Sequence, residues 1–352
     1  MQSSTIPWVV VGLDNGGNAN NATVLDATGK FLVDRLFENP SRVLEGPEAA
    51  VEALATSFSS VLAHVGVAAE SVRAVGLDTP GPASAEGVIS SRGSTNFAHP
   101  GWRTFDFRGA VEARLGVPVV YNNDGNAAAL YAHYQLFGLL AGQRSSISAI
   151  VGTGLGGGVI VQGNVVKGAA GMAGELGHVH IPMDGLLGPG QPTPHCNCGF
   201  DGDAESVASL TAIEKNLLPY WLSQFPNHEL AQQSSMSKAA KLVRGYGERQ
   251  DPLALRIFER QAIALGRLFT IAANFTDPDA YFVGGGVIEA EPSFREWFLN
   301  TVKAHTALRE EQTRVARFEI VPDLDKAGAR GAAIGALEHV RGAEIAARLT
   351  GQ

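Results

Sequence analysis

Short apolar runs alternate with longer amphipathic segments along the first half of the chain. Apolar runs of about 4–8 residues bounded by turn residues are typical of buried strands, whereas apolar positions spaced three and four apart over longer stretches indicate helices. Pro47 supports the start of one such helix, because a proline in the first turn lacks only an N–H that would be unpaired there anyway. The pattern predicts strands at 8–14, 22–26, 31–36, 72–77 and 117–121, and helices at 47–65 and 124–140.

The second half of the chain repeats the pattern with which the first half begins. An apolar run at 147–151 leads through a glycine-rich turn at 152–158 into a returning apolar run at 159–161, as the first strand leads through a polar turn into the second. This weak internal repeat predicts two related α/β halves. Farther along, the pattern predicts helices at 253–274 and 328–349, separated by a strand at 280–283.

The chain length of 352 residues is enough for two domains of ordinary size. The second strand–turn–strand pattern follows a helix that begins just after Asn122, so we place the domain boundary there. We expect an N-terminal domain at 1–122 and a C-terminal domain at 123–336. The final helix, at about 337–352, is expected to pack back on the N-terminal domain.

Composition and charge exclude several classes of protein. The net charge of −8 disfavours a nucleic-acid-binding surface. The two cysteines provide no disulfide framework, which fits a reducing compartment. Residues 1–7 lack the charged and apolar regions of a signal peptide, and the apolar stretch at 127–141 is too short and too polar to span a bilayer. We therefore expect a cytoplasmic protein that binds neither nucleic acid nor membrane.

The only two cysteines, Cys196 and Cys198, lie one residue apart, downstream of His178 and before Asp203. Zinc accepts thiolate, imidazole and carboxylate ligands in a tetrahedron, so these four residues are candidate metal ligands. The alternative is that both cysteines are ordinary thiols in a loop rich in glycine and proline. His195 is a spare imidazole that could substitute as a ligand, or a surface residue of that loop.

The segment Gly174–His178, followed by Cys196–Glu205, resembles the signature of the ROK family of sugar kinases and regulators. The usual pattern is E-x-G-H followed by C-x-C-G-x-x-G-C-x-E; here Asp203 replaces the third cysteine, and the stretch before Cys196 is longer than usual. The resemblance places the chain in the actin/hexokinase-like ATPase superfamily. It implies two actin-like (ribonuclease H-like) α/β domains with an interdomain active-site cleft, a structural zinc ion and a homodimer.

Three glycine-rich turns resemble the segments with which this family binds Mg·ATP. Glycine lets the backbone approach phosphate oxygens closely, and an aspartate at a strand end can hold Mg²⁺ through water. Each turn, taken alone, is equally consistent with a hairpin or a strand-to-helix connection. The resemblance implies phosphate binding by Asp14, Gly16, Gly17 and Asn18, where the family has threonine at the last position, and by Gly152, Thr153 and Gly154, with adenosine at Gly284, Gly285 and Gly286.

The segment Asn122–Ala128 resembles the family sequence E-N-D-A-N-A-A and contains our candidate general base, Asp124. Phosphoryl transfer needs a positioned hydroxyl, an acceptor for its proton and neutralisation of charge, and a carboxylate at a strand end can accept that proton. The alternative is that Asp124 caps the helix that follows, although Asn123 or Asn126 can serve as the cap instead.

Polar residues beside these motifs are the candidates for the sugar site. Carboxylates and an imidazole can hydrogen-bond vicinal hydroxyls, and a metal bound to the same histidine would fix the orientation of its ring. The resemblance implies that the sugar is bound by Gly81, Asn96, Asn123, Asp124, Glu175, His178 and Glu205.

These features together predict an ATP-dependent kinase that phosphorylates the 6-hydroxyl of a hexose, with glucose as the leading substrate. Alternatives within the class are kinases for N-acetylglucosamine, N-acetylmannosamine, fructose or allose, since specificity lies in loop shape. A non-catalytic sugar-sensing protein is disfavoured because no DNA-binding segment precedes the first strand and Asp124 is present. A polyphosphate-dependent kinase would require a basic groove that no cluster of lysine and arginine indicates.

Overall fold

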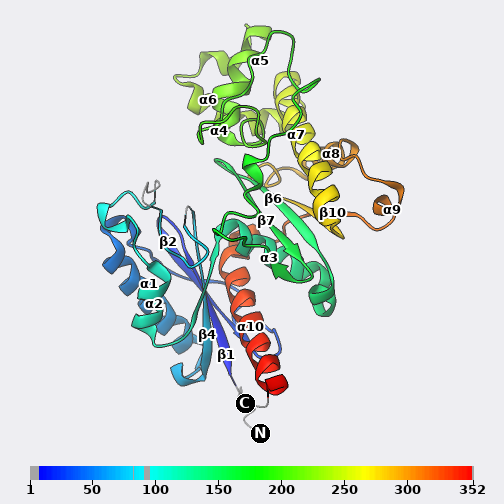
Figure 1. Cartoon of the computed structure of the whole chain (residues 1–352). Helices are drawn as coiled ribbons and strands as arrows, with labels where there is room; N and C mark the ends of the chain where they lie inside the picture. The colour runs from blue at the N-terminus through cyan, green and yellow to red at the C-terminus, as the bar shows by residue number, and fades with distance from the viewer. Residues whose placement is uncertain (1–7, 82, 91–95, 351–352) are drawn as a thin grey trace. The chain divides into compact units, whose positions relative to one another are not determined.

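The computed structural model describes residues 8–81, 83–90 and 96–350, which fold into two compact units (Figure 1). The first unit contains residues up to 136, residues 165–173 and residues from 323 onward; the second contains 137–164 and 174–322. Residues 1–7, assessed above for a signal peptide, and residues 351–352 of the expected final helix lie outside the described residues. None of the helices that the structure describes has the length and apolar character needed to cross a membrane.

The first unit is built on a five-stranded sheet with helices on both faces. Its elements are β1 (Val9–Asn15), β2 (Ala19–Asp26), β3 (Phe37–Pro40), α1 (Pro47–Val65), β4 (Val72–Thr79), α2 (Phe107–Leu115), β5 (Val119–Asn123), α3 (Asp124–Phe137) and α10 (Leu324–Thr350). The strand order is β3-β2-β1-β4-β5, with β1, β4 and β5 parallel and β2 antiparallel to both of its neighbours. Val11 and Leu13 of β1 join the core that α1 and α2 cover, while the alternate residue Gly12 meets α10.

The second unit is built on a second five-stranded sheet in the order β10-β9-β6-β7-β8. Its strands are β6 (Ser146–Val151), β7 (Leu155–Val161), β8 (Asn164–Val165), β9 (Ala280–Gly285) and β10 (Arg317–Ile320). Its helices are α4 (Leu210–Ala212), α5 (Leu218–Gln224), α6 (Met236–Glu248), α7 (Pro252–Thr276), α8 (Pro292–Ala304) and α9 (Glu310–Thr313). Strand β6 pairs antiparallel with β7 and parallel with β9. In the first unit, β1 pairs in the same way with β2 and β4. The predicted repeat of strand, turn and strand is therefore present in both sheets.

The predicted strand at 31–36 is wrong, because β3 starts one residue later and pairs with the beginning of β2. The segment 31–36 instead packs against α10. The guanidinium of Arg330 lies 4.6 Å from the centre of the Phe31 ring and donates a hydrogen bond of 3.0 Å to the carbonyl oxygen of Asp34. Tertiary contact with a distant helix therefore overrides the local apolar pattern.

Several predicted boundaries also shift; β2, for example, begins at Ala19 and α10 at Leu324, three and four residues earlier than expected. Strand β7 already begins at Leu155, so the glycines at 156–158 belong to the strand and the turn contains only Gly152–Gly154. Strand β5 lies two residues later than expected. Helix α3 ends at Phe137 because the next residue, Gly138, adopts a left-handed backbone conformation with φ of 51°.

Helix α10 lies directly on the backbone of the first sheet, because glycines remove the side chains that would separate them. A Cβ atom at Gly76 of β4 would lie 1.8 Å from the carbonyl oxygen of Ala332. A Cβ atom at Gly331 of the helix would lie 1.8 Å from the carbonyl oxygen of Ala127 in α3. The small residues on both sides thus lock β4, α3 and α10 together (Figure 1).

The compact units consequently have different bounds from the domains expected from the sequence. The expected boundary falls near Asn122, whereas the first unit continues to residue 136 and includes α3. It also takes in all of α10 rather than only a final segment at about 337–352. The close backbone contacts of α10 with β1, β4 and α3 explain both differences.

We predict that Gly331→Ala lowers the melting temperature, because the added methyl group forces α10 away from α3. Overpacking of this kind costs about 1–3 kcal/mol. The matched control is Gly342→Ala in the same helix, where nothing lies within 4 Å of the added Cβ. There the higher helix propensity of alanine should stabilise by up to about 1 kcal/mol. Thermal unfolding followed by circular dichroism checks both; equal melting temperatures for the two variants would contradict the packing argument.

Candidate active site

Three aspartates gather at the carboxyl ends of the parallel strands of the first unit. Asp14 near the end of β1 pairs in register with Asp78 near the end of β4, and Asp78 in turn pairs with Asn122 of β5. Asp124 follows as the first residue of α3. The carboxyl edge of a parallel sheet is where α/β proteins place their ligands, so this row is the centre of the candidate site.

The row concentrates negative charge where the protein partly excludes water. Burial raises the pKa of Asp14 to about 6, opposed by a hydrogen bond from Asn21 and aided by the charge of Asp124. Burial, with the charges of Asp14 and Asp124, holds the pKa of Asp78 well above its usual range. Shifts of this kind, at neighbouring carboxyl groups, are typical of functional sites. The sequence analysis assigned no role to Asp78, because its pairing with Asp14 depends on strand register.

Asp124 is left available for chemistry, because its neighbour caps the helix. The Asn123 side-chain oxygen accepts a hydrogen bond of 2.7 Å from the amide of Asn126, which is the usual geometry of an N-cap. Asp124 accepts a 2.7 Å hydrogen bond from the amide of Gly125 and remains solvent-accessible. Neighbouring protein atoms nevertheless remove part of its hydration and raise its pKa, which suits a general base.

The turn between β1 and β2 is a tight hairpin in which the amide of Gly16 donates to the carbonyl oxygen of Ala19 at 2.9 Å. The structure brings the predicted Asn96 beside this turn, since a Cβ atom at Gly17 would lie 2.6 Å from its side-chain oxygen. The carbonyl of Asn18 accepts a hydrogen bond from the amide of Ser41, which fixes the end of the turn. Gly81, also predicted to line the sugar, faces open space in the described part of the chain.

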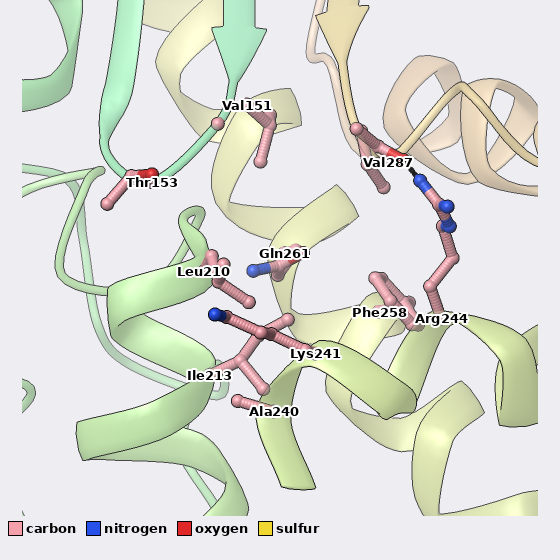
Figure 2. A pocket seen from close by; sticks show the side chains of 12 residues that line it. Val151, Thr153, Leu210, Ile213, Ala240, Lys241, Arg244, Phe258, Gln261 and Val287 are labelled. Carbon is pink, nitrogen blue, oxygen red and sulfur yellow. Dashed lines mark hydrogen bonds between the residues drawn. The ribbon is translucent and has the colours of Figure 1, made fainter. Parts of the chain in front are cut away.

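Two of the predicted nucleotide segments line one pocket in the second unit, with a volume of about 300 Å³ (Figure 2). Gly152 and Thr153 form one wall, and Gly286 forms another, whereas the predicted Gly154 does not line the pocket. Gly285 ends β9 with φ of 90°, and a Cβ atom there would lie 2.1 Å from the carbonyl oxygen of Val151. Only glycine fits that position, which explains why this run of glycines follows the strand. Gly284 and Gly285 are both residues of β9, and neither lines the pocket, so only Gly286 of the three predicted glycines does.

The rest of the pocket comes from helices that the sequence motifs did not reveal. Its apolar walls include Leu210, Ile213 and Phe258, whereas Lys241 extends into the pocket from α6 (Figure 2). Arg244 of the same helix donates a 2.8 Å hydrogen bond to the carbonyl oxygen of Gly286. A mostly apolar cavity with a few directed polar groups is the ordinary form of a small-molecule site. The only sequence signal for Lys241 and Arg244 was their spacing on one helix face.

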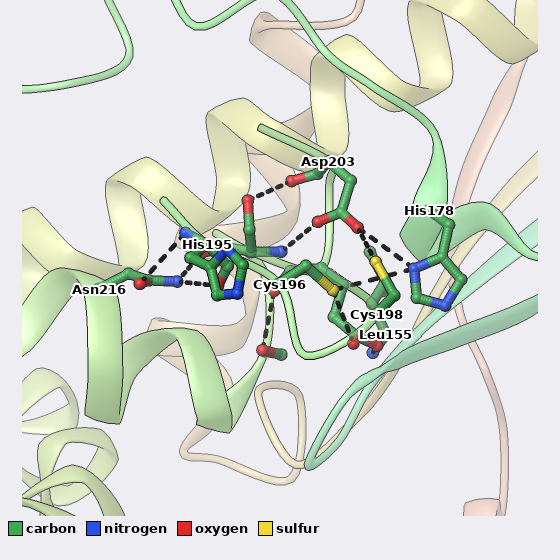
Figure 3. A network of polar contacts seen from close by, with 10 residues as sticks. Leu155, His178, His195, Cys196, Cys198, Asp203 and Asn216 are labelled. Atoms are coloured by element: carbon green, nitrogen blue, oxygen red, sulfur yellow. Dashed lines mark hydrogen bonds and ion pairs between the residues drawn. The ribbon is translucent and has the colours of Figure 1, made fainter. Parts of the chain in front are cut away.

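The four predicted metal ligands lie together in the second unit (Figure 3). Donor atoms of His178, Cys196, Cys198 and Asp203 all lie within 4.8 Å of one another. The Asp203 carboxylate lies 3.2 Å from His178 Nδ1 and 3.4 Å from Cys198 Sγ. Two sulfurs, one imidazole nitrogen and one carboxylate oxygen at these separations fit a single tetrahedral ion. His195 instead pairs with Asp201 at 2.7 Å, as a residue of the loop surface.

Electrostatics inside this cluster are set by hydrogen bonds. Burial acts to raise the pKa of Asp203, but hydrogen bonds hold it below its usual range. These bonds come from Cys196, the amide of Ser206, His178 and Cys198. Burial raises the pKa of the Cys196 thiol. A bound cation would reverse that preference, because metal coordination deprotonates a thiol.

Glu205 joins the metal cluster to the turn Gly152–Gly154. One carboxylate oxygen accepts a 2.7 Å hydrogen bond from the amide of Leu155, and the other lies 3.4 Å from Cys196 Sγ. The sequence predicted sugar binding for Glu205, and the structure shows that both of its oxygens already have protein partners. Glu175, predicted for the same role, directly precedes the one-turn helix Leu176–His178 and so lies beside the cluster.

Comparison with known proteins identifies the family. The ROK family model matches residues 10–339 of this chain. Glucokinase of Streptomyces coelicolor is 32% identical over 285 residues, which cover 79% of this chain and 82% of the relative. The structure of a ROK hexokinase from Thermus thermophilus matches with a TM-score of 0.73 at 30% identity and covers 95% of this chain and 99% of its own. A ROK family glucokinase from Streptomyces griseus, solved with glucose and AMPPNP, matches with a TM-score of 0.66 at 27% identity. The match covers 94% of this chain and 99% of that glucokinase.

The chain therefore belongs to the ROK family. Its two α/β units have the actin-like fold of the matching kinase structures, as the sequence predicted.

Proposed function

We propose that this protein is an ATP-dependent hexose kinase that transfers the γ-phosphoryl group to the 6-hydroxyl of its sugar, with glucose as the leading substrate. The observation that carries the proposal is Asp124, an accessible carboxylate with a raised pKa whose helix is capped by a different residue. The matching glucokinase and hexokinase, at about 30% identity, support the sugar-kinase class.

Asp124 would act as the general base. As the 6-hydroxyl oxygen forms its bond to the γ-phosphorus, the bond from phosphorus to the β–γ bridging oxygen breaks, and ADP leaves. The hydroxyl proton passes to the Asp124 carboxylate and is later released to solvent. This proton transfer requires an ionised carboxylate and is favoured when the pKa of that carboxylate is raised toward the working pH, which is the direction in which burial shifts the pKa of Asp124.

The nucleotide would occupy the pocket of the second unit. Its apolar walls suit a purine base, and the glycines at 152 and 286 allow the backbone to approach ribose and phosphate closely. Lys241 would supply positive charge near the phosphates, and the amides at Gly16 and Gly17 form the other predicted phosphate turn. Mg²⁺, held at Asp14, would neutralise charge that develops on the transferred phosphoryl group.

The sugar would be held by polar residues of the motifs that the sequence singled out. Asn96 and Asn123 of the first unit offer amide groups, and Glu175 and His178 of the second offer a carboxylate and an imidazole. Such a polar set can discriminate hydroxyl patterns, because a mismatched sugar leaves polar groups unpaired. We propose zinc as a structural ion at His178, Cys196, Cys198 and Asp203 that fixes the His178 ring for this contact.

The function is tested by coupling ADP release to a spectrophotometric signal with Mg·ATP and six hexoses in turn. We expect the highest kcat/KM with glucose, and lower values with mannose, fructose, allose, N-acetylglucosamine and N-acetylmannosamine. A different preferred sugar would overturn the glucose assignment but keep the kinase. If none of the six sugars causes ADP release but ATP still binds in a filter assay, a sugar sensor would be favoured instead.

We predict that Asp124→Asn lowers kcat by roughly 10²–10⁴-fold, while the KM for sugar changes little, because the base acts on the proton and not on binding. In the wild type, kcat/KM should fall as pH is lowered through the pKa of Asp124, which lies above the ordinary value of 3.8. The value of kcat/KM falls at low pH because only the ionised carboxylate accepts a proton. Steady-state kinetics across pH measures both effects, with equal melting temperatures as the folding control; near-normal turnover in the variant would exclude Asp124 as the base.

We predict one zinc ion per chain in protein purified without chelator, and a loss of most of it in Cys198→Ser. The control is His195→Ala, which should retain zinc because His195 pairs with Asp201 outside the cluster. Inductively coupled plasma mass spectrometry measures the metal, and the melting temperature should fall when zinc is lost. Less than one zinc per wild-type chain would count against this ligand set.

A further inference from the structure

Asp78 is a buried carboxyl group to which the proposed reaction gives no role. Its side chain is 0% exposed, and neither carboxylate oxygen has a hydrogen-bond partner among the described residues. An unpaired buried carboxylate costs several kcal/mol, and polar atoms of this kind are normally satisfied by protein or by a bound group. Something absent from the bare chain is therefore expected to interact with Asp78.

The space around Asp78 is shared with Asp14 and is kept open by a glycine. The two aspartates pair in register on adjacent parallel strands. A Cβ atom at Gly328, near the start of α10, would lie 2.9 Å from Asp78 Oδ2 and 3.4 Å from Asp14 Oδ2. Both carboxylates thus face the same small space, and glycine is the residue that leaves it unfilled.

Among the described residues, no ion pair neutralises the carboxylates that face this space. In the part of the chain that the structure describes, no lysine, arginine or histidine forms an ion pair with Asp14, Asp78 or Asp124. Arg330 of α10, close in sequence to Gly328, is directed instead to Tyr131 and to the carbonyl of Asp34. Burial and the mutual repulsion of the carboxylates disfavour two negative charges here in the bare protein.

We propose that Asp14 and Asp78 together bind one divalent cation of the Mg²⁺ type, with Asp78 as the second carboxylate ligand. Mg²⁺ is typically held by one or two carboxylates, with water and substrate phosphates completing its octahedron. Asp14 lies directly before the phosphate turn at Gly16, so the cation sits where it can meet the phosphates. The proposal rests on the proposed kinase function, because ATP brings that cation, and it extends the site to a residue that no family motif singled out.

The test is a titration of each purified protein with Mn²⁺ alone, in which electron paramagnetic resonance measures free Mn²⁺. The wild type should bind one Mn²⁺ per chain saturably, and Asp78→Asn should weaken binding by roughly 10-fold or more, as expected when a metal site is disrupted. The matched control is Asp34→Asn, which removes an exposed charge from the same unit and should bind like the wild type. If Asp78→Asn fails to fold, Asp78→Ala replaces it.

A second variant fills the proposed site and leaves both carboxylates intact. Gly328→Ala should weaken Mn²⁺ binding like Asp78→Asn, whereas Gly342→Ala in the same helix should not, because nothing lies near its added Cβ. Melting temperatures give an independent readout. Mg²⁺ should stabilise the wild type, since a ligand that binds only the folded state raises its stability. Asp78→Asn should gain little or nothing from Mg²⁺, because the second carboxylate ligand has been removed.

The outcomes separate this proposal from the kinase assignment. Wild-type Mn²⁺ affinity in Asp78→Asn, or no Mn²⁺ bound by the wild type, would overturn the cation site and identify Asp78 as a buried carboxyl group held in its protonated form. Loss of Mn²⁺ binding in both Asp78→Asn and Gly328→Ala would establish it. Hexose phosphorylation is measured independently. If the wild type phosphorylates no hexose but both variants lose Mn²⁺ binding, the proposed kinase function is wrong and the cation site stands.

Discussion

The contact between α10 and the first sheet is the constraint on which the candidate site depends. Gly12 and Gly76 bring two central strands against the helix backbone, and Gly331 brings the same helix against α3. Side chains larger than hydrogen at these positions would hold the layers apart, because close-packed interiors do not absorb an extra methylene without strain. The contact fixes the start of α10 beside the ends of β1 and β4, and so places Gly328 over the aspartates.

The row of carboxyl groups at those strand ends is electrostatically unfavourable in the bare protein. Burial raises the pKa of all three aspartates. The charge of Asp124 adds to the rise at Asp14, and the charges of Asp14 and Asp124 add to the rise at Asp78. A fold selected only for stability would place cations or neutral residues there. The arrangement is understandable if stability is traded for the ability to hold a cation and to accept a proton, as is common at functional sites.

In the second unit, hydrogen bonds link the phosphate turn, the metal cluster and the pocket into one structure. Glu205 contacts both Cys196 and the amide of Leu155. The start of α4 holds the turn from the other side, since the amide of Leu210 donates to the Gly152 carbonyl and the Thr211 hydroxyl donates to that of Thr153. A metal ion bound to the cluster would therefore influence the turn Gly152–Gly154, and with it the shape of the pocket, through a single carboxylate.

The sequence by itself determined the elements whose signals are local. Buried strands, the proline-started helix at 47–65 and the order of glycine turns all follow from short-range patterns, and the same is true of the Cys-x-Cys segment. The grouping of His178, Cys196, Cys198 and Asp203 was predictable as well, because these residues follow the spacing of the family signature. The strands, the helix start and the turns are encoded by residues within a few positions of one another, where backbone conformation and side-chain spacing suffice.

Only the tertiary structure decided which distant residues meet. Parallel pairing of β1 with β4 puts Asp78 beside Asp14, and packing of α10 draws both α3 and the segment 31–36 into the first unit. Local propensity likewise left three possible caps for α3, and the structure selects Asn123. Lys241 and Arg244 reach the pocket from a helix that carries no motif. Strand register and helix packing are set by contacts across the whole fold, so no short window of sequence contains them.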